Sequence, residues 1–300
     1  MRKDNKRTIA LYMFPAILMI VVLLYLPIFI NLYESFFSWG AMSSSHKFVG
    51  IGNYMKMFKD EVFYTALKNN MIFMIMSVIF QIGLSLIIAN TLESKFMRKT
   101  QNIFQSIYFI PSLLMVTVVG IAFKMICSPS IGIINPLLEL IGINTENIDL
   151  LGNAGSATFS IAAMSQWQYI GYTVVLFVVA IQNIPADLYE AADIDGATRW
   201  KKMWYITLPS ISSSIIVMLI ISIGNIFSVD LDRILLMYNS SVYSTADVIQ
   251  TYVYRIAFES PGFPDYSYGT AVNMLKSVIA FILVLAANKL ATKYSETRLF

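Results

Sequence analysis

Six stretches of this chain are long and apolar enough to cross a lipid bilayer, which takes about 20 residues of helix each. Hydrophobic residues make up 57% of the 300 residues and charged residues only 13%, whereas a soluble domain carries about a quarter charged residues. We therefore predict an all-α polytopic membrane protein with six transmembrane helices, forming a single transmembrane domain over residues 1–300. The predicted spans cover residues 9–33, 68–92, 103–127, 157–182, 209–229 and 269–291.

The first of these stretches follows a basic N-terminus and could also be interpreted as a secretory signal peptide. Its apolar run from Thr8 to Ile30 is longer than the roughly 7–15 residues of a signal-peptide core. No small-residue cleavage site follows the run. These two features favour a first span that is retained in the membrane.

Basic residues are distributed unequally over the segments that join the predicted spans. With the N-terminus in the cytoplasm, 13 of the 21 lysines and arginines lie on the cytoplasmic side and six lie outside, while Lys124 and Lys276 fall within spans. This bias follows the positive-inside rule and predicts that both termini are cytoplasmic in a multi-pass plasma-membrane protein. Segments 34–67, 128–156 and 230–268 would then lie on the outer side.

A polar insert, YEAADIDGATRWKKMWYITLP, interrupts the apolar pattern between the fourth and fifth spans, on the predicted cytoplasmic side. Asn183 can cap a helix that has Pro185 in its first turn, and Gly196 can end that helix with a positive φ. Thr198 stands near the start of a second short helix. We predict a helix–turn–helix over residues 183–208, although local physics alone fits an amphipathic loop on lipid headgroups equally well.

The insert resembles the cytoplasmic EAA signature of bacterial ABC importer permeases, E-A-A-x-x-D-G-A followed by I-x-L-P, at the spacing of that family. Where the family often has phenylalanine, this chain has Met203, which keeps an apolar contact. The segments FVGIGNYMKMF, YFIPSLL and SPSIGIINPLLELIG resemble the carbohydrate-type permeases, and SIGNIFSVDLDRILLMYNSSVYSTADVIQTYVYR looks like the branch that imports oligosaccharides derived from complex polysaccharides. The residues that match the signature are Glu190, Ala191, Ala192, Asp195, Gly196, Ala197, Ile206, Leu208 and Pro209.

This resemblance implies a permease subunit that forms half of the translocation pore of an ATP-driven importer, with the insert docked on an ATPase. The implied partners are a second permease subunit, a cytoplasmic ABC ATPase dimer that holds Mg-ATP, an extracytoplasmic solute-binding protein, an oligosaccharide and membrane lipids, with no nucleic acid. The chain has no Gly-Lys pair and hence no phosphate-binding loop, and one histidine and one cysteine cannot build a metal cluster. We therefore predict no enzymatic activity, cofactor or metal on this chain.

Polar residues inside membrane spans are costly and usually face a cavity or a partner helix. In QWQYIGY of the fourth span, Gln168, Tyr169 and Tyr172 share one helical face. Gln166 and Trp167 are expected to point elsewhere. Amides and aromatic faces suit a passing sugar, but an aromatic belt, helix-linking glutamines and a snorkelling lysine explain the same residue types. The candidates for a substrate path are Gln168, Tyr169, Tyr172, Asn225, Asn273 and Lys276.

Other interpretations of the sequence stay open. The same architecture could import a polyol or a peptide. A membrane-embedded glycan-processing enzyme would need paired acids near the membrane face, for which Asp230 and Asp232 are available, and a secondary transporter would need more spans and internal repeats. The amphipathic segment 246–258 either lies at the outer surface, where a binding protein could be received, or packs as scaffold. The sequence names neither the sugar nor the partner chains.

Overall fold

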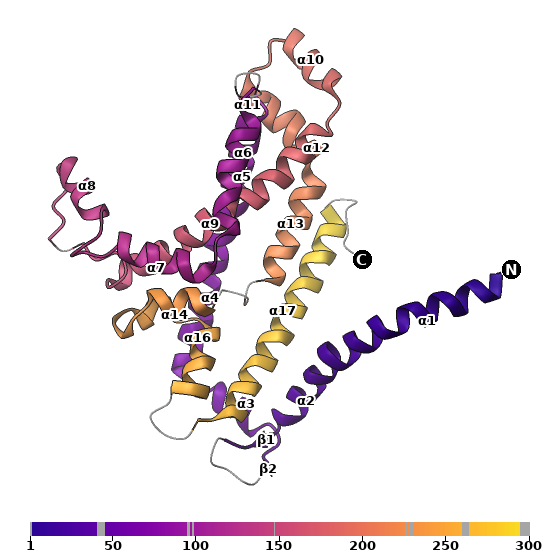
Figure 1. Ribbon diagram of the computed structural model, residues 1–300, viewed down its shortest axis with the longest axis vertical. Coiled ribbons are helices and arrows are strands. Elements are labelled where there is room, and N and C mark those ends of the chain that lie inside the picture. Colours follow the sequence, from indigo (N-terminus) through magenta and orange to yellow (C-terminus); the bar gives the residue numbers. More distant parts are fainter. Residues whose placement is uncertain are drawn as a thin grey trace. The chain divides into compact units, whose positions relative to one another are not determined.

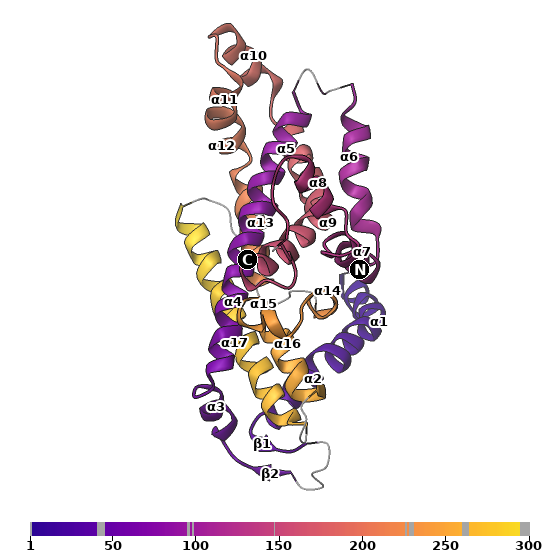
Figure 2. The same cartoon turned by 90° about the vertical axis from the view of Figure 1, so that its left-hand side faces the viewer.

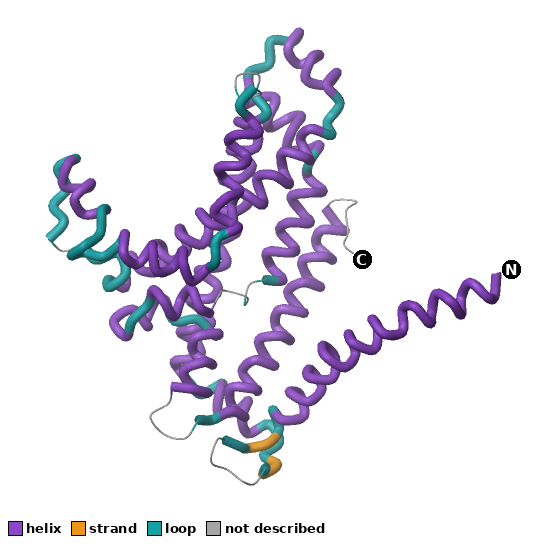
Figure 3. Tube along the Cα trace, in the orientation of Figure 1, coloured by secondary structure: helices purple, strands orange, loops and turns teal. Residues whose placement is uncertain are grey.

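Helices dominate the computed structural model, and the strands of its described residues form one short antiparallel pair (Figure 3). The structure describes residues 2–40, 46–94, 97, 99–146, 148–225, 227, 231–259 and 264–294, with side chains from Thr8 to Thr292 within those ranges. The chain divides into two units, Met1–Phe63 with Tyr252–Val278 and Tyr64–Thr251 with Ile279–Phe300.

The membrane-spanning character predicted from the sequence is confirmed by the helices of the described residues. Four continuous helices are long and apolar enough to cross a membrane, and the number rises to six if two bent helix pairs each count as one span. An exact count of six therefore stays a prediction. The continuous helices cover Thr8–Glu34, Glu61–Leu92, Ala154–Gln182 and Tyr266–Thr292, and the bent pairs join Gln101–Leu113 to Val116–Ile126 and Arg199–Ser210 to Ser212–Gly224.

The third and fifth predicted spans are broken, by bends of 98° and 68° respectively, and each break follows a proline. Pro111 lies in a short 3-10 turn, after which Leu114 takes extended backbone. Pro209 has no N–H to donate to the preceding turn. The segment before it, Met203–Thr207, is a π-helix, in which backbone hydrogen bonds join residues five apart and not four apart as in an α-helix. Part of the fifth predicted span, 226 and 228–229, lies outside the described residues.

The first unit carries the N-terminal helices and a small sheet. Its strands pair Phe37 with Phe48 and Ser38 with Lys47. Asn53 holds the chain that leads into the sheet. Its Nδ2 donates to the backbone carbonyls of Ser35 and Phe37, at 2.9 Å in both cases. The elements that begin in this unit are α1 (Arg2–Ile20), η1 (Val21–Tyr25), α2 (Leu26–Glu34), β1 (Phe37–Ser38), β2 (Lys47–Phe48), α3 (Gly52–Met57), α4 (Glu61–Val78), η6 (Arg255–Glu259) and α17 (Tyr266–Tyr294).

Two sequence segments of the first unit are joined by a buried polar cluster. The phenol oxygens of Tyr252 and Tyr268 lie 3.0 Å apart, and both bond to Asp60 Oδ2. Lys56 Nζ lies 2.8 Å from Asp265 Oδ2 and 4.4 Å from the centre of the Tyr268 ring. Because Tyr252 is buried in this cluster, the structure favours the scaffold interpretation of segment 246–258.

The central helix of the second unit is α9 (Ala154–Gln182). Of its most apolar 18 residues 56% are buried, against 17% or less for the other continuous spans. Helices α5 and α6 pack along it, and α10 extends beyond their ends (Figures 1 and 2). The other elements that begin in this unit are η2 (Ile79–Leu84), α5 (Ser85–Leu92), α6 (Gln101–Phe109), η3 (Ile110–Leu113), α7 (Val116–Ile126), α8 (Ile134–Leu140), α10 (Ala186–Ile194), α11 (Arg199–Lys202), η4 (Met203–Thr207), α12 (Leu208–Ser210), α13 (Ser212–Gly224), α14 (Leu231–Met237), η5 (Ser240–Val242), α15 (Tyr243–Ala246) and α16 (Ile249–Tyr254).

Candidate functional site

The polar insert folds as the predicted helix–turn–helix. Helix α10 ends in a Schellman motif, in which the Ala197 N–H donates to the Ala192 carbonyl at 2.9 Å and the Gly196 N–H donates to the Asp193 carbonyl at 3.2 Å. Gly196 has φ 68°, a conformation that glycine adopts without the penalty that a Cβ would bring. Thr198 then caps α11 by accepting from the Lys201 N–H. The sequence therefore predicted the turn correctly.

The start of the same motif differs from the prediction. Pro185, not Asn183, occupies the N-cap position of α10, and no side chain caps it. Asn183 instead stands at the end of α9, where its Nδ2 donates to the Val179 carbonyl at 2.9 Å. The physical reason is competition between two helix ends only three residues apart, because an asparagine satisfies a terminal carbonyl as readily as a terminal N–H.

The tip of the insert presents acidic and apolar groups outward. Glu190, Ala191, Asp195 and Gly196 are exposed, while Ala192 and Ala197 are half-buried. Beside them Ile194, the last residue of α10, is 87% exposed. Ile194 therefore adds one exposed apolar group to the acidic tip. Sequence reasoning missed Ile194, although an apolar residue between two aspartates is visible in EAADIDGA.

The insert is tied to the helices behind it by polar contacts. Tyr189 Oη lies 2.9 Å from Thr207 Oγ1, and Lys202 Nζ lies 2.5 Å from Asp193 Oδ1. Burial, with the nearby Glu93 charge, raises the pKa of the Tyr189 phenol and keeps it a neutral partner, although its bond to Thr207 works the other way. These contacts join α10 to the start of the bent helix pair.

The last three residues of the signature continue this link to the core. Ile206 and Leu208 are half-buried and Pro209 is exposed. Ile206 packs against the apolar cluster that contains Phe177 and Ile211. The I-x-L-P part of the signature is therefore the root of the insert, whereas Glu190 and Gly196 belong to its tip.

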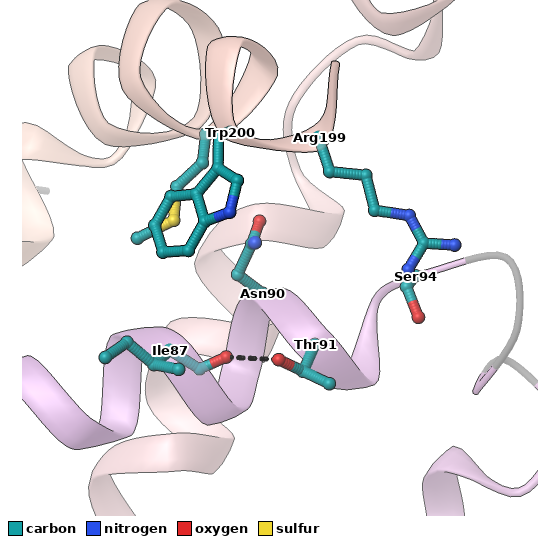
Figure 4. A pocket seen from close by; sticks show the side chains of 7 residues that line it. Ile87, Asn90, Thr91, Ser94, Arg199 and Trp200 are labelled. Atoms are coloured by element: carbon teal, nitrogen blue, oxygen red, sulfur yellow. Dashed lines mark hydrogen bonds between the residues drawn. The ribbon is translucent and has the colours of Figure 1, made fainter.

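A small cavity of about 180 Å³ lies between the end of α5 and the second limb of the insert. Figure 4 shows Arg199 and Trp200 projecting toward Asn90, Thr91 and Ser94. Thr91 donates to the Ile87 carbonyl of its own helix at 2.7 Å. Met203, the methionine that replaces the usual phenylalanine, also lines this cavity, together with the apolar Ile87 and the polar residues of α5.

A larger cavity of about 330 Å³ lies within the second unit, between α4, α9, α13 and α14. Two side-chain hydrogen bonds link the helices that form its walls. Gln166 Nε2 donates to Ser77 Oγ and Gln81 Nε2 donates to Thr173 Oγ1, each at 3.1 Å. The polar and aromatic residues that line it are Ser77, Gln81, Ser165, Gln166, Tyr169, Tyr172, Ser222, Asn225 and Arg233.

Three of the predicted substrate-path residues, Tyr169, Tyr172 and Asn225, line this cavity. Gln166 lines it too, so the prediction that it points elsewhere is wrong. The cavity face of α9 is centred on positions 162, 166 and 169, which follow the 3–4 residue spacing of one helix face. Trp167 lies outside the cavity, tilted against Phe123 at 6.3 Å between ring centres.

Gln168 is fully buried and does not line the cavity. Its Nε2 donates to the Leu114 carbonyl at 2.9 Å, which satisfies an oxygen that the break in the third span leaves without a helical partner. Its Oε1 accepts from Arg233 Nη2 at 2.8 Å. Gln168 therefore bonds to Arg233 and to the Leu114 carbonyl and does not face the cavity.

Sequence reasoning missed Arg233, counting it among the basic residues outside the membrane. It is 2% exposed, lines the cavity, and places its guanidinium carbon 5.1 Å from the centre of the Tyr169 ring. Its partner Gln168 stands midway along the 29-residue helix α9, roughly 21 Å from either end. The sequence signal that could have identified Arg233 is a basic residue within the short apolar segment LDRILLM.

The other two predicted path residues lie in the first unit. Asn273 and Lys276 are half-buried on α17, and the Asn273 carbonyl accepts from Ser277 Oγ at 2.9 Å. Their part in a substrate path stays a prediction.

The acids of the enzyme alternative do not form a described pair. Asp230 lies outside the described residues, and Asp232 is exposed. Among the described residues no group of three His, Cys, Asp or Glu side chains could hold a metal ion.

Comparison with known proteins decides between these interpretations. The family model of the binding-protein-dependent transport system inner membrane component matches residues 81–292. The chain belongs to this family. It is thus a multi-pass inner-membrane transport permease and not an enzyme, which removes the glycan-processing alternative.

Individual members of the permease family match the chain over nearly its full length. A probable ABC transporter permease protein of Bacillus subtilis, YurN, is 32% identical over 99% of both chains. The arabinooligosaccharides transport system permease protein AraP of Halalkalibacterium halodurans is 30% identical over 90% of this chain and 83% of its own. In the crystal structure of a bacterial alginate ABC transporter complexed with a periplasmic protein bound to alginate pentasaccharide, one chain superposes with TM-score 0.87 and 29% identity over 99% of both chains.

Proposed function

We propose that this chain is one of two permease subunits of an ATP-driven importer, and that it forms half of the pore for an oligosaccharide delivered by an extracytoplasmic binding protein. The observation that carries the proposal is the full-length match to a chain of the alginate transporter, which was crystallised with a sugar-loaded periplasmic protein. The arabinooligosaccharide permease supports the same solute class. One of these relatives handles an acidic sugar and the other a neutral one, so family membership leaves the charge of the solute open.

The lining of the larger cavity supports a sugar over other solutes of the same architecture. Tyr169 and Tyr172 offer ring faces, and Gln166 and Asn225 offer amide donors and acceptors. Sugars are held by this combination, because ring faces cover their C–H surfaces while amides bond their hydroxyls. A polyol lacks the ring faces that tyrosines would cover, and a peptide would require groups for two charged ends.

In this proposal the insert is the joint to a separate ATPase dimer, which holds Mg-ATP and performs the hydrolysis. The exposed tip around Glu190 and Gly196 contacts the ATPase, and the Tyr189–Thr207 and Lys202–Asp193 contacts pass its movement to the membrane helices. Both termini and the insert lie in the cytoplasm, and a second permease subunit completes the pore.

The joint can be tested at Ile194, because its side chain is 87% exposed and we expect its replacement to leave the fold intact. Ile194→Asp puts a charge where an apolar contact with the ATPase is proposed. We expect at least tenfold weaker co-purification of the ATPase, which corresponds to about 1.4 kcal/mol of binding free energy, and a matching loss of oligosaccharide uptake.

The matched control is Leu140→Asp. Leu140 is also the last residue of a short helix, α8, and is 82% exposed. This variant should bind the ATPase as the wild type does. Normal ATPase binding and uptake in Ile194→Asp would contradict the proposed joint.

A further inference from the structure

The smaller cavity lies where the end of the second span meets the second limb of the insert. Both segments belong to the second unit, and both lie on the predicted cytoplasmic side of the membrane. Figure 4 shows that side chains from the two segments face each other across it. We call this surface the α5–α11 groove; it is lined by Ile87, Asn90, Thr91, Ser94, Arg199, Trp200 and Met203.

The second-span side of the groove changes from apolar to polar along one helix face. Leu84, Ile87, Thr91 and Ser94 are three or four residues apart and therefore share a face. The two apolar residues are exposed, Thr91 is exposed and Ser94 is half-buried. The order is apolar toward the membrane interior and hydroxyl-bearing toward the cytoplasm, which matches the order of acyl chain and headgroup in a phospholipid.

The insert side of the groove supplies a positive charge that no described acid neutralises. Arg199 is exposed, and among the described residues no carboxylate forms an ion pair with it. The nearest acids in the sequence are engaged elsewhere. Glu93 accepts hydrogen bonds from two glutamine side chains, and Asp193 pairs with Lys202. The guanidinium is therefore available to an anionic ligand.

The groove also offers neutral donors to an anion. The side chains of Asn90 and Ser94 form no hydrogen bond within the part of the chain that the structure describes, so both can donate to a phosphate oxygen. Lys95 and Arg98 follow Ser94 in the sequence and lie outside the described residues. Because both are basic, their charge attracts an anion as the charge of Arg199 does.

Exposed aromatic rings beside the groove favour a lipid over a soluble phosphate compound. Trp200 is 66% exposed, and Trp204, one turn further along the same limb, is 61% exposed. Tryptophan is enriched at the level of the lipid headgroups, where its ring is apolar and its N–H is polar. A soluble phosphate compound would leave these rings and Ile87 uncovered.

We propose that the α5–α11 groove binds an anionic phospholipid of the cytoplasmic leaflet. The phosphate bonds to Arg199 and Ser94, because bonds between a guanidinium and a phosphate are about twice as strong as bonds between neutral groups. One acyl chain follows Ile87 and Leu84 toward the membrane interior. The lipid thereby joins the second limb of the insert to the end of the second span. This inference goes beyond the proposed function and is independent of the solute that is carried.

The test uses the complete importer, purified in detergent, freed of lipid and kept without sugar. It is titrated with phosphatidylglycerol, which is anionic, and with phosphatidylcholine, which has no net charge, and native mass spectrometry counts the bound lipids. We expect the wild type to prefer phosphatidylglycerol. In Arg199→Gln the affinity for phosphatidylglycerol should fall about fivefold, the contribution of one basic residue near an anionic membrane surface, while the affinity for phosphatidylcholine stays the same.

Two further variants distinguish a built site from general attraction to a basic surface. Lys201→Gln removes the same charge from the adjacent, exposed position of α11, which does not line the groove, and should leave the preference unchanged. Ser94→Asp leaves Arg199 in place but adds a negative charge to the groove, so binding of phosphatidylglycerol should fall again. The amount of ATPase that co-purifies is recorded for every variant and should stay at the wild-type level.

Four results would overturn the inference. The wild type could show no preference for phosphatidylglycerol, or Lys201→Gln could lose as much affinity as Arg199→Gln, which would indicate attraction to the surface as a whole. Glycerol phosphate could displace the lipid at constant ionic strength, which would indicate a site for a soluble phosphate compound. Loss of the ATPase from Arg199→Gln and Ser94→Asp would indicate that the groove is a protein contact. A failure to take up any oligosaccharide contradicts the proposed function and leaves the lipid site standing.

Discussion

Gly171 shows how a single residue sets the geometry around the cavity. A Cβ at this position would lie 2.0 Å from the Tyr108 carbonyl oxygen, so only glycine lets the end of α6 approach α9 this closely. Small residues allow such backbone contact between membrane helices. The approach brings the break of the third span against α9, where Gln168, one turn earlier, reaches the Leu114 carbonyl.

Gly171→Ala should therefore destabilise the protein. The added methyl meets backbone atoms, which cannot rotate away, and overpacking of this kind costs about 1–3 kcal/mol. A lower Tm of the purified protein in detergent would report the loss. The control is Gly83→Ala, whose Cβ would meet nothing within 4 Å and which should be neutral or stabilising by about 0.5–1 kcal/mol. Equal Tm values for the two variants would show that α6 is free to shift.

The sequence predicted that the fourth span has a functional face, but it predicted only in part which residues lie on that face. A polar cluster at QWQYIGY indicated a functional face, and Tyr169 and Tyr172 do line the cavity. Gln166 and Gln168 exchange the roles expected of them, because the direction of a helix face depends on the helices packed around it. Arg233 depends on a contact between residues 65 positions apart, which periodicity does not reveal.

At the scale of elements, buried polar contacts hold the first unit together where its apolar contacts are few. None of the most apolar stretch of the first helical span, Thr8–Glu34, is buried. The segments 37–60 and 252–268 are joined by the hydrogen bonds among Asp60, Tyr252 and Tyr268. Burial alone would raise the pKa of Asp60, but the bonds from Tyr252, a backbone N–H and Tyr268 outweigh burial and hold this pKa below its ordinary value of 3.8.

The sign of the resulting pH dependence follows directly. A carboxyl whose pKa is lower in the folded state stabilises the fold above its unfolded pKa, near 4, and the contribution is lost as the pH falls through the folded pKa. Asp60→Asn should lower the Tm at pH 7 by roughly 2–4 °C, and the difference from wild type should shrink below about pH 4. Asp187→Asn, at an exposed helix start, is the control without this pH dependence. A difference that stays constant down to pH 3 would exclude the charge of Asp60 as its source.

The elements themselves were largely predictable, because long apolar runs have few alternatives to helix in a membrane. The continuous helices begin and end within three residues of the predicted bounds, except that the second begins at Glu61 and not at the predicted residue 68. The two bends were not predicted. A proline is tolerated inside a membrane helix when neighbouring groups satisfy the freed backbone, and those neighbours, such as Gln168 at the Leu114 carbonyl, are known only once the helices are packed.

For the whole molecule, the orientation in the membrane rests on the distribution of charge. Thirteen basic residues on one side against six on the other predict that the insert and both termini lie in the cytoplasm. The proposed docking on an ATPase depends on this orientation, since ATP is available only there. The same orientation puts segment 128–156, which contains no lysine or arginine, on the outer side.

Single cysteines in a cysteine-free background can test this orientation. The native Cys127 is buried and is replaced by serine. Ser130→Cys, a near-isosteric change at an exposed position, should react with a membrane-impermeant thiol reagent added to intact cells. Lys201→Cys, exposed in the insert, should react only after the membrane is permeabilised. We expect at least tenfold stronger labelling of residue 130 than of residue 201 in intact cells, because an impermeant reagent is confined to the outer side and a six-span chain with both ends inside places these segments on opposite sides. The reverse pattern would invert the protein in the membrane and remove the insert from the reach of any ATPase. Labelling of both residues from outside would mean that an even number of spans separates them, in place of the single predicted span.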